Sequence, residues 1–188
     1  MKTNPILVAI AVACLTSCKK EAAKPMQPIA SEIALMNVIS LPETIPDGAC
    51  LKLRLVKDST NYDETMIRLV HTATAAYNAN EDGIYFTGFG QEQLSSVSQE
   101  GTDLAINALN YAPGMTVCLD VHGKRSGVYL LQLSYRKNIP PGIQVWLKDA
   151  YRKDSLEISH YNYHFDLYPT DTASFGRYRF SVVIRPGA

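Results

Sequence analysis

The residues of this chain that could do chemistry are few and lie far apart in the sequence. Its serines and four histidines do not form the Gly-x-Ser-x-Gly turn that presents the nucleophile of α/β-hydrolases. His160 and His164 are four residues apart, and on a strand their α-carbons would be separated by about 13 Å, too far to share one metal ion. These patterns favour a protein that is not an enzyme.

An oxygen-rich segment beginning at Asn78 is the best candidate for binding a metal. Ca²⁺ accepts carboxylate and amide oxygens, so Asn78, Asn80 and Asp82 are candidate calcium ligands. The segment lacks the ligand spacing of an EF-hand, and Asn and Asp are also common in ordinary turns. A calcium site and a plain turn therefore both remain open, and we expect no other cofactor.

Two cysteines, Cys50 and Cys118, lie in segments with the pattern of strands. In an oxidising compartment they would form a disulfide that closes a loop of about 68 residues and contributes about 4 kcal/mol. The alternative is a pair of free thiols that pack as small apolar side chains. Cys118 alternates with Val117 and Leu119, which weakens the case for the disulfide, but the sequence leaves both alternatives open.

Aromatic residues are a further candidate for binding, because the chain has eleven Tyr, five Phe and one Trp. Exposed aromatic side chains stack on sugars or anchor protein partners. Tyr161, Tyr163 and Phe165 alternate along one strand face, where packing is the expected role. Tyr151 and Tyr168 lie beside turns, and we expect these two to contact a partner or a glycan.

Strands must position all of these residues, because a period of two runs through the chain after Asp47-Gly48. Leu51, Leu53 and Leu55, for example, alternate with polar residues. The strands expected on this basis are 50–55, 66–69, 83–89, 104–108, 117–121, 128–135, 143–147, 156–158, 161–167 and 178–184. About ten short strands separated by Gly, Pro and Asn turns predict an all-β fold, an antiparallel β-sandwich of jelly-roll or Ig-like type.

The N-terminus has the order of a secretion signal, with Lys2 followed by the apolar run 6–13. This run is too short to cross a bilayer, which takes roughly 20 apolar residues. It ends in Leu15-Thr16-Ser17-Cys18, which resembles the lipobox of bacterial lipoproteins. The resemblance implies cleavage before Cys18 and acylation of this residue, and a lipid anchor gains about 0.8 kcal/mol per buried CH₂.

The segment after Cys18 is polar and carries Pro25 and Pro28, which is typical of a flexible tether. We therefore expect a signal peptide over 1–17, a tether over 18–30 and a β-sandwich domain over 31–188. The chain has 18 basic and 18 acidic residues. This balance argues against nucleic acid as a partner, which would favour a basic face.

The second half of the chain resembles a β-sandwich module of large Bacteroidetes surface and gliding proteins that leave the cell by type IX secretion. The resemblance rests on Leu147-Lys148-Asp149, Glu157-Ile158, Tyr163-His164-Phe165 and Arg179-Phe180, and it extends over roughly residues 48–185. It implies an adhesion or assembly module at the cell envelope, and it implies no catalytic residues.

Taken together, these patterns predict an envelope lipoprotein without enzymatic activity, anchored to the outer membrane through Cys18 and binding another envelope protein. The side of the outer membrane that it faces remains open. A glycan-binding accessory lipoprotein is the alternative, and exposed aromatic side chains on one sheet face would favour it. An enzyme would instead need a cleft in which polar groups converge.

Overall fold

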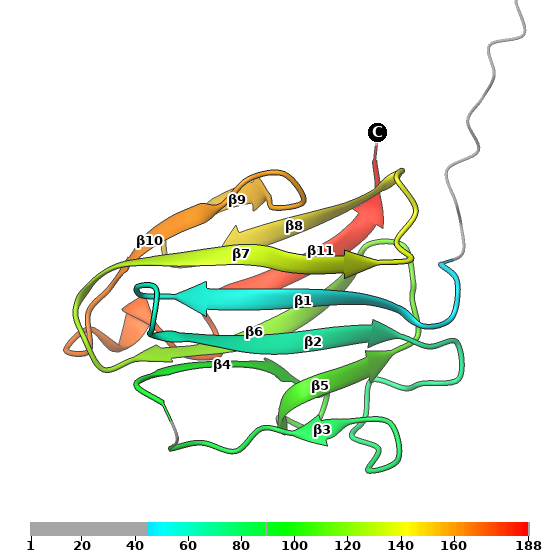
Figure 1. The fold of residues 1–188 in the computed structure, drawn as a ribbon, viewed down its shortest axis with the longest axis horizontal. Coiled ribbons are helices and arrows are strands. Elements are labelled where there is room, and N and C mark those ends of the chain that lie inside the picture. Colours follow the sequence, from blue (N-terminus) through cyan, green and yellow to red (C-terminus); the bar gives the residue numbers. More distant parts are fainter. Residues whose placement is uncertain (1–44, 89, 188) are drawn as a thin grey trace, which may run out of the picture. The chain divides into compact units, whose positions relative to one another are not determined.

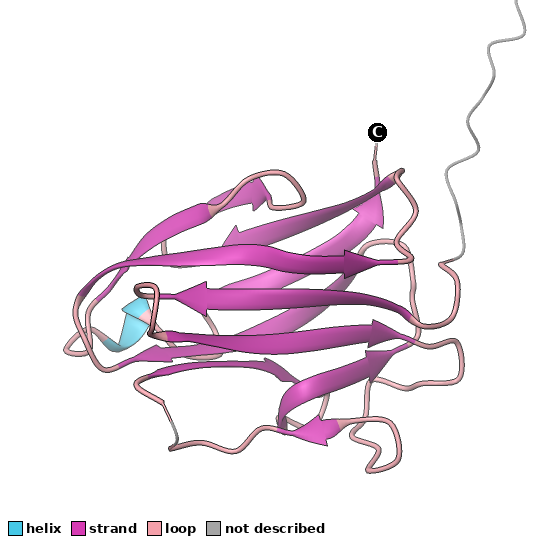
Figure 2. Cartoon of the chain, in the orientation of Figure 1, coloured by secondary structure: helices cyan, strands magenta, loops and turns pink. Residues whose placement is uncertain are grey.

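Strands make up nearly all the regular structure of the computed structural model, which describes residues 45–88 and 90–187 (Figures 1 and 2). The strands are β1 (Ala49–Val56), β2 (Tyr62–Leu69), β3 (Gly83–Ile84), β4 (Glu92–Val97), β5 (Asp103–Leu109), β6 (Met115–Gly123), β7 (Gly127–Lys137), β8 (Ile143–Asp149), β9 (Asp154–Glu157), β10 (Tyr163–Leu167) and β11 (Phe180–Pro186), with one 3-10 turn, η1 (Thr172–Ser174). The predicted all-β class is confirmed. Within the described ranges, no helix has the length and apolar character needed to cross a membrane.

The strands form one continuous path in the order β10-β7-β1-β2-β5-β4-β6-β11-β8-β9, and β3 adds to β5 off this path. In Figure 1, β7, β1, β2 and β5 lie in front of β6, β11 and β8. The ends of the path, β9 and β10, are consecutive in the sequence, so the sheet comes close to closing on itself. The result is a mixed, nearly closed, barrel-like sheet.

This architecture differs from the predicted antiparallel sandwich in two respects. Hydrogen bonds link the strands into one sheet, and β2 runs parallel to β5, whereas the other described pairs are antiparallel. The sequence pattern did not reveal the parallel pair, because side chains alternate with the same period in both orientations. The long connection between β2 and β5, which carries β3 and β4, makes the parallel pairing possible.

The core lies between the two layers of the barrel and begins with the alternation of β1. Leu51, Leu53 and Leu55 have no exposed surface and face residues from both layers. Each fully buried leucine stabilises the fold by about 1.5–3 kcal/mol. β1 lies between β7 and β2 and is hydrogen-bonded to both over most of its length, so the start of the domain is held at the centre of the front layer.

The predicted strand over 83–89 is wrong in extent, and one strand was missed. The strand β3 ends at Ile84, and Phe86 is 74% exposed in the turn that follows. β4 escaped prediction because it buries Glu92, Ser95 and Ser96, which break the apolar alternation. Groups on other strands and loops satisfy these side chains: for example, Glu92 Oε1 accepts a hydrogen bond from Arg125 Nη2 at 3.1 Å, and the Ser96 hydroxyl donates to the Leu104 carbonyl oxygen at 3.2 Å.

Candidate functional site

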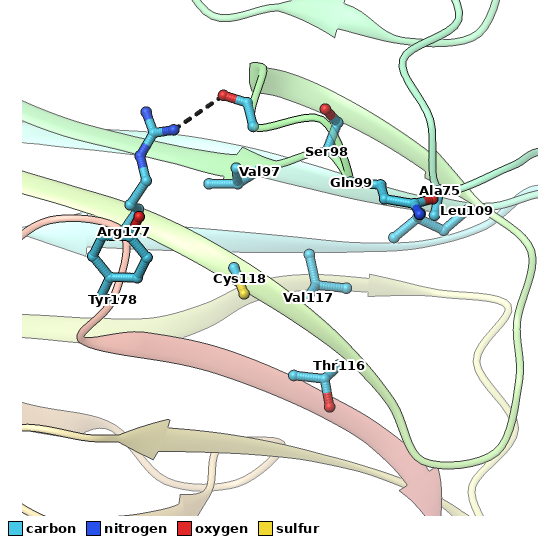
Figure 3. A pocket seen from close by; sticks show the side chains of 11 residues that line it. Ala75, Val97, Ser98, Gln99, Leu109, Thr116, Val117, Cys118, Arg177 and Tyr178 are labelled. Carbon is cyan, nitrogen blue, oxygen red and sulfur yellow. Dashed lines mark hydrogen bonds between the residues drawn. The ribbon is translucent and has the colours of Figure 1, made fainter.

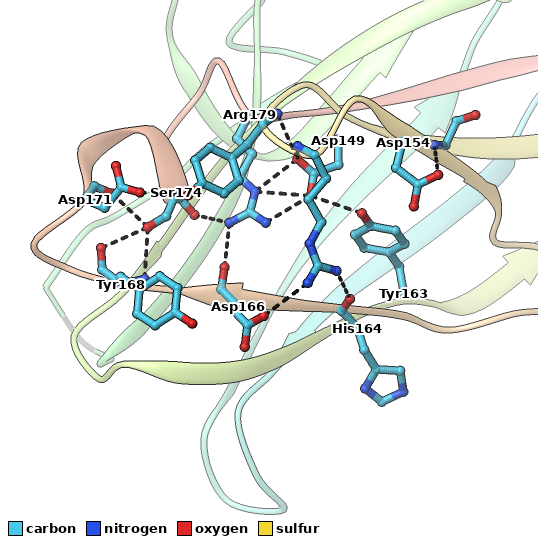
Figure 4. A network of polar contacts seen from close by, with 12 residues as sticks. Asp149, Asp154, Tyr163, His164, Asp166, Tyr168, Asp171, Ser174 and Arg179 are labelled. Carbon is cyan, nitrogen blue, oxygen red and sulfur yellow. Dashed lines mark hydrogen bonds and ion pairs between the residues drawn. The ribbon is translucent and has the colours of Figure 1, made fainter.

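A buried ion pair lies beneath the turn that leads into β11 (Figure 4). The guanidinium of Arg179 donates to Asp149 on β8 with Nη2 to Oδ2 at 2.9 Å, and neither side chain has exposed surface. Asp149 also accepts the Tyr163 hydroxyl at 3.1 Å. Burial, helped by the charge of Asp149, raises the pKa of Tyr163 to about 12, so this hydroxyl keeps its proton. A buried charge pair is tolerated when its remaining hydrogen-bonding positions are filled in this way.

The same region closes the open edge of β10. The His164 carbonyl oxygen accepts a hydrogen bond from Arg152 Nη1 at 3.0 Å, and the Asp166 carbonyl oxygen accepts one from Arg179 Nη1 at 2.7 Å. Side-chain donors thus replace the neighbouring strand that β10 lacks on this side. An exposed strand edge is a template for aggregation. The two guanidinium groups therefore protect the edge of β10, where the barrel does not close.

A second arginine fixes the other side of the turn. Arg177 donates to the Gly101 carbonyl oxygen at 3.0 Å and to Asp103 Oδ2 at 3.0 Å, and it approaches Asp120 Oδ2 at 3.4 Å. Asp120 lies 2.8 Å from His122 Nε2. Burial opposes the ionisation of Asp120, but His122 and Arg177 outweigh it and hold the pKa of this carboxyl below its usual range. Hydrogen bonding to Asp120 in turn raises the pKa of His122.

Tyr178 stands between these two anchored arginines and is 91% exposed, the most exposed of the large apolar side chains in the described residues. Three depressions of about 460, 500 and 730 Å³ surround it, and Arg177 and Tyr178 line all three. We call Tyr178 and these depressions the Tyr178 surface. Because ion pairs hold the residues on both sides of Tyr178, the aromatic side chain is presented from a fixed turn.

The floor of the Tyr178 surface is the outward face of β6, β11 and β8. Cys118, Ser181 and Lys148 are cross-strand neighbours there and form a row of outward side chains. The first depression opens over Cys118, with Tyr178 to its left and Val97 above it in Figure 3. The sheet thus supplies the small side chains of Cys118 and Ser181 and the longer Lys148 as a floor, and the turn supplies a large aromatic wall.

Of the two tyrosines predicted to contact a partner, Tyr151 belongs to this surface and Tyr168 does not. Tyr151 lines the third depression, is 46% exposed, and donates its hydroxyl to Asp171 Oδ2 at 2.9 Å. Its ring also packs against the guanidinium of Arg179 at 4.9 Å. Tyr168 is 43% exposed but lies outside the linings of the three depressions.

The candidate calcium ligands form a turn closed by its own hydrogen bonds. Asp82 accepts the Asn78 amide at 2.8 Å through one carboxylate oxygen and the Ala108 amide at 2.7 Å through the other. The Asn78 side-chain oxygen accepts the Asn80 amide at 3.1 Å. In the part of the chain that the structure describes, no three His, Cys, Asp or Glu side chains are grouped so that they could hold a metal ion. Calcium binding through the Asn oxygens stays a prediction.

The two cysteines of the domain are free thiols in this structure. Cys50 is buried on β1, whereas Cys118 is exposed on β6, in the other layer of the barrel. Outward alternation on β6 explains the exposure, because Val117 and Leu119 take the inward positions.

Sequence reasoning gave Arg179 no structural role and treated Tyr178 merely as the start of the last strand. Both belong to the Arg-Tyr-Arg run at 177–179. An aromatic residue between two basic residues, just before an apolar strand, was the sequence pattern that could have indicated the site. The residues on which the family resemblance rests do meet in space: Asp149, Tyr163 and Arg179 form the buried hub.

Cys18 and the expected signal peptide and tether lie outside the described residues. Comparisons of the chain with protein-family models, with curated proteins and with solved structures gave no match.

Proposed function

We propose that this domain is a non-enzymatic binding module of the bacterial envelope, and that the Tyr178 surface holds its protein partner. The observation that carries the proposal is the 91% exposure of Tyr178 on a turn that two ion-paired arginines fix. Aromatic side chains bury about 150–250 Å² each and are enriched among residues that dominate binding energy. A preorganised anchor also loses little conformational entropy on binding.

The envelope part of the proposal rests on the resemblance of Leu15-Thr16-Ser17-Cys18 to a lipobox. We propose an outer-membrane lipoprotein of the kind found in Bacteroidetes, held through acylated Cys18. We also propose that the two layers of the barrel correspond to the two sheets of a jelly-roll or Ig-like module. The layered core supports this correspondence, since inward side chains of both layers pack together there.

Crosslinking in cells tests the binding role. The tagged chain would be purified from its own membranes after mild crosslinking, as wild type, Tyr178→Ala and Tyr161→Ala. Tyr161 is 63% exposed and lies outside the three depressions, so it is a matched control. Loss of a central aromatic anchor costs 2 kcal/mol or more, roughly 30-fold in affinity. We expect a reproducible partner to disappear with Tyr178→Ala alone; equal recovery from all three forms would refute the role of this surface.

Membrane fractionation tests the anchor. Cys18→Ala should release the protein from membranes, and full retention of this variant would contradict lipidation as the tether. Protease added to intact cells would then report the side of the outer membrane on which the domain lies.

One observation favours a glycan-binding lipoprotein as the second candidate. Trp146 points outward from β8 on the same face as Lys148, in the layer over which Tyr178 stands. Its indole donates to Gln144 Oε1 at 3.0 Å, and Arg185 packs 4.5 Å from its ring, which together fix its orientation. Binding on a glycan array that is lost with Trp146→Ala, together with no reproducible protein partner, would favour this function over the first.

A further inference from the structure

The first depression of the Tyr178 surface is suited to an apolar side chain. Val97, Cys118 and Tyr178 line it over the buried Leu109 and Val117, and Ser98, Gln99 and Thr116 add polar groups at its margin. Of the described residues that line this depression, Arg177 alone carries a charge, and Asp103 pairs with it. Its volume of about 460 Å³ leaves room for a large side chain such as leucine or phenylalanine.

The second depression, which shares Cys118 and Tyr178 with the first, carries excess positive charge. Four basic and two acidic residues line it, but Asp149 neutralises Arg179 and Asp103 matches Arg177, so the excess comes from Lys148 and Lys153. Lys148 and Lys153 are exposed, and neither is ion-paired within the described part of the chain. Asp154 is the acidic residue that remains to oppose them.

We propose that the Tyr178 surface recognises a protein segment that presents a large apolar side chain next to an acidic one. This inference rests on the proposed binding function and specifies its partner. The apolar side chain enters the first depression, and the carboxylate meets Lys148 and Lys153 across Tyr178. Complementary charge at the rim of an interface speeds association and selects among partners, whereas the buried apolar anchor supplies most of the affinity.

The lining of the two depressions favours a protein segment over an acidic polysaccharide. A sugar ring presents hydroxyl groups around its rim and needs several polar partners; Ser98, Gln99 and Thr116 offer some, whereas the apolar side chains of Val97 and Tyr178 offer a larger apolar contact. An aliphatic or aromatic side chain has no hydrogen bonds to lose on entering the depression, and the apolar contact outweighs the rotamer freedom that it gives up.

Peptide selection tests the inference. A phage-displayed library of random 12-residue peptides would be selected on the detergent-solubilised full chain and on four variants: Lys148→Gln/Lys153→Gln, Tyr178→Ala, and the distant controls Lys137→Gln and Tyr161→Ala. On the wild type and both controls, we expect enrichment of Asp or Glu beside a large apolar residue. Without Lys148 and Lys153, the acidic preference should disappear and the selected peptides should bind roughly three- to tenfold more weakly.

The variants separate this inference from the proposed function. If selected peptides depend on Tyr178 but show no acidic preference, or keep it in the double lysine variant, the inference fails and the binding role stands. If Tyr178→Ala leaves every selected peptide bound, the proposed surface fails as well. Oligogalacturonate is the parallel probe: its binding through Tyr178, with no peptide enriched, would replace the protein segment by an acidic glycan.

Discussion

Arg179→Met offers the sharpest test of the buried hub. The substitution keeps much of the side-chain volume but leaves the Asp149 carboxylate buried without its cation, a change that typically costs 3–5 kcal/mol. The variant also withdraws donors from the carbonyl oxygens of Asp166 and Ser174. We therefore expect a loss of about 4–5 kcal/mol, a large part of the total stability of a domain of this size. At roughly 2–4 °C per kcal/mol, the melting temperature should fall by about 8–20 °C.

Urea unfolding followed by fluorescence provides the assay, because Trp146 is the single tryptophan of the chain. Arg68→Met is the control: Arg68 is exposed on β2, and we expect a change within about 0.5 kcal/mol. The double variant Arg179→Met/Asp149→Asn should lose less than the two single losses combined, with a coupling of at least about 1.5 kcal/mol. An Arg179→Met loss below about 1 kcal/mol, or strict additivity, would refute the hub.

Three further predictions concern pH, thiol reactivity and packing. Because folding raises the pKa of His122, its stabilising contribution is complete below the unfolded pKa of about 6.5 and is lost as the pH rises through the folded pKa. The difference in urea midpoint between wild type and His122→Gln should therefore shrink from about pH 6 to pH 9, and a constant difference would contradict the pairing. A maleimide should label Cys118 within minutes in the native protein and Cys50 only in urea, and mass spectrometry of wild type and Cys118→Ser would assign the labelled thiol. Equal labelling rates would contradict the different burial of the two cysteines. Finally, a Cβ at Gly123 would lie 2.7 Å from Cζ of the buried Tyr129, so Gly123→Ala should cost about 1–3 kcal/mol in the urea titration, and an unchanged midpoint would show that the ring has room to move.

The elements that follow from local pattern were predictable, and those that depend on distant partners were not. The alternation over 50–55 predicts β1 because leucines fill one face and charged residues the other. β4 has no such signal, since Glu92 and Ser96 are buried by contacts with Arg125 and Thr65 that no local window contains. The closing of the barrel also depends on how strands pair, and sequence spacing does not determine that.

The candidate site also combines residues that local pattern predicts with residues whose placement depends on distant partners. The sequence placed Tyr151 beside a turn and made it a candidate; it lines the third depression, and its contact with a partner stays a prediction. The exposure of Tyr178 was not foreseeable, because strand alternation gives no account of the turn before β11. That turn is fixed by Asp103 and Asp149, which precede it by 74 and 30 residues.

The central place of β1 has a mechanical consequence under the proposal that Cys18 anchors the chain and that Tyr178 binds a partner. A pull on Tyr178 would then load the back layer through the turn at 177–179, while a pull from the N-terminal side would load the start of β1 in the front layer. Both edges of β1 are hydrogen-bonded, to β7 and to β2, so the strand must slide past two ladders at once instead of peeling from one. Loaded in shear along its whole length, β1 would break many hydrogen bonds together, so the domain should resist force applied between these two points.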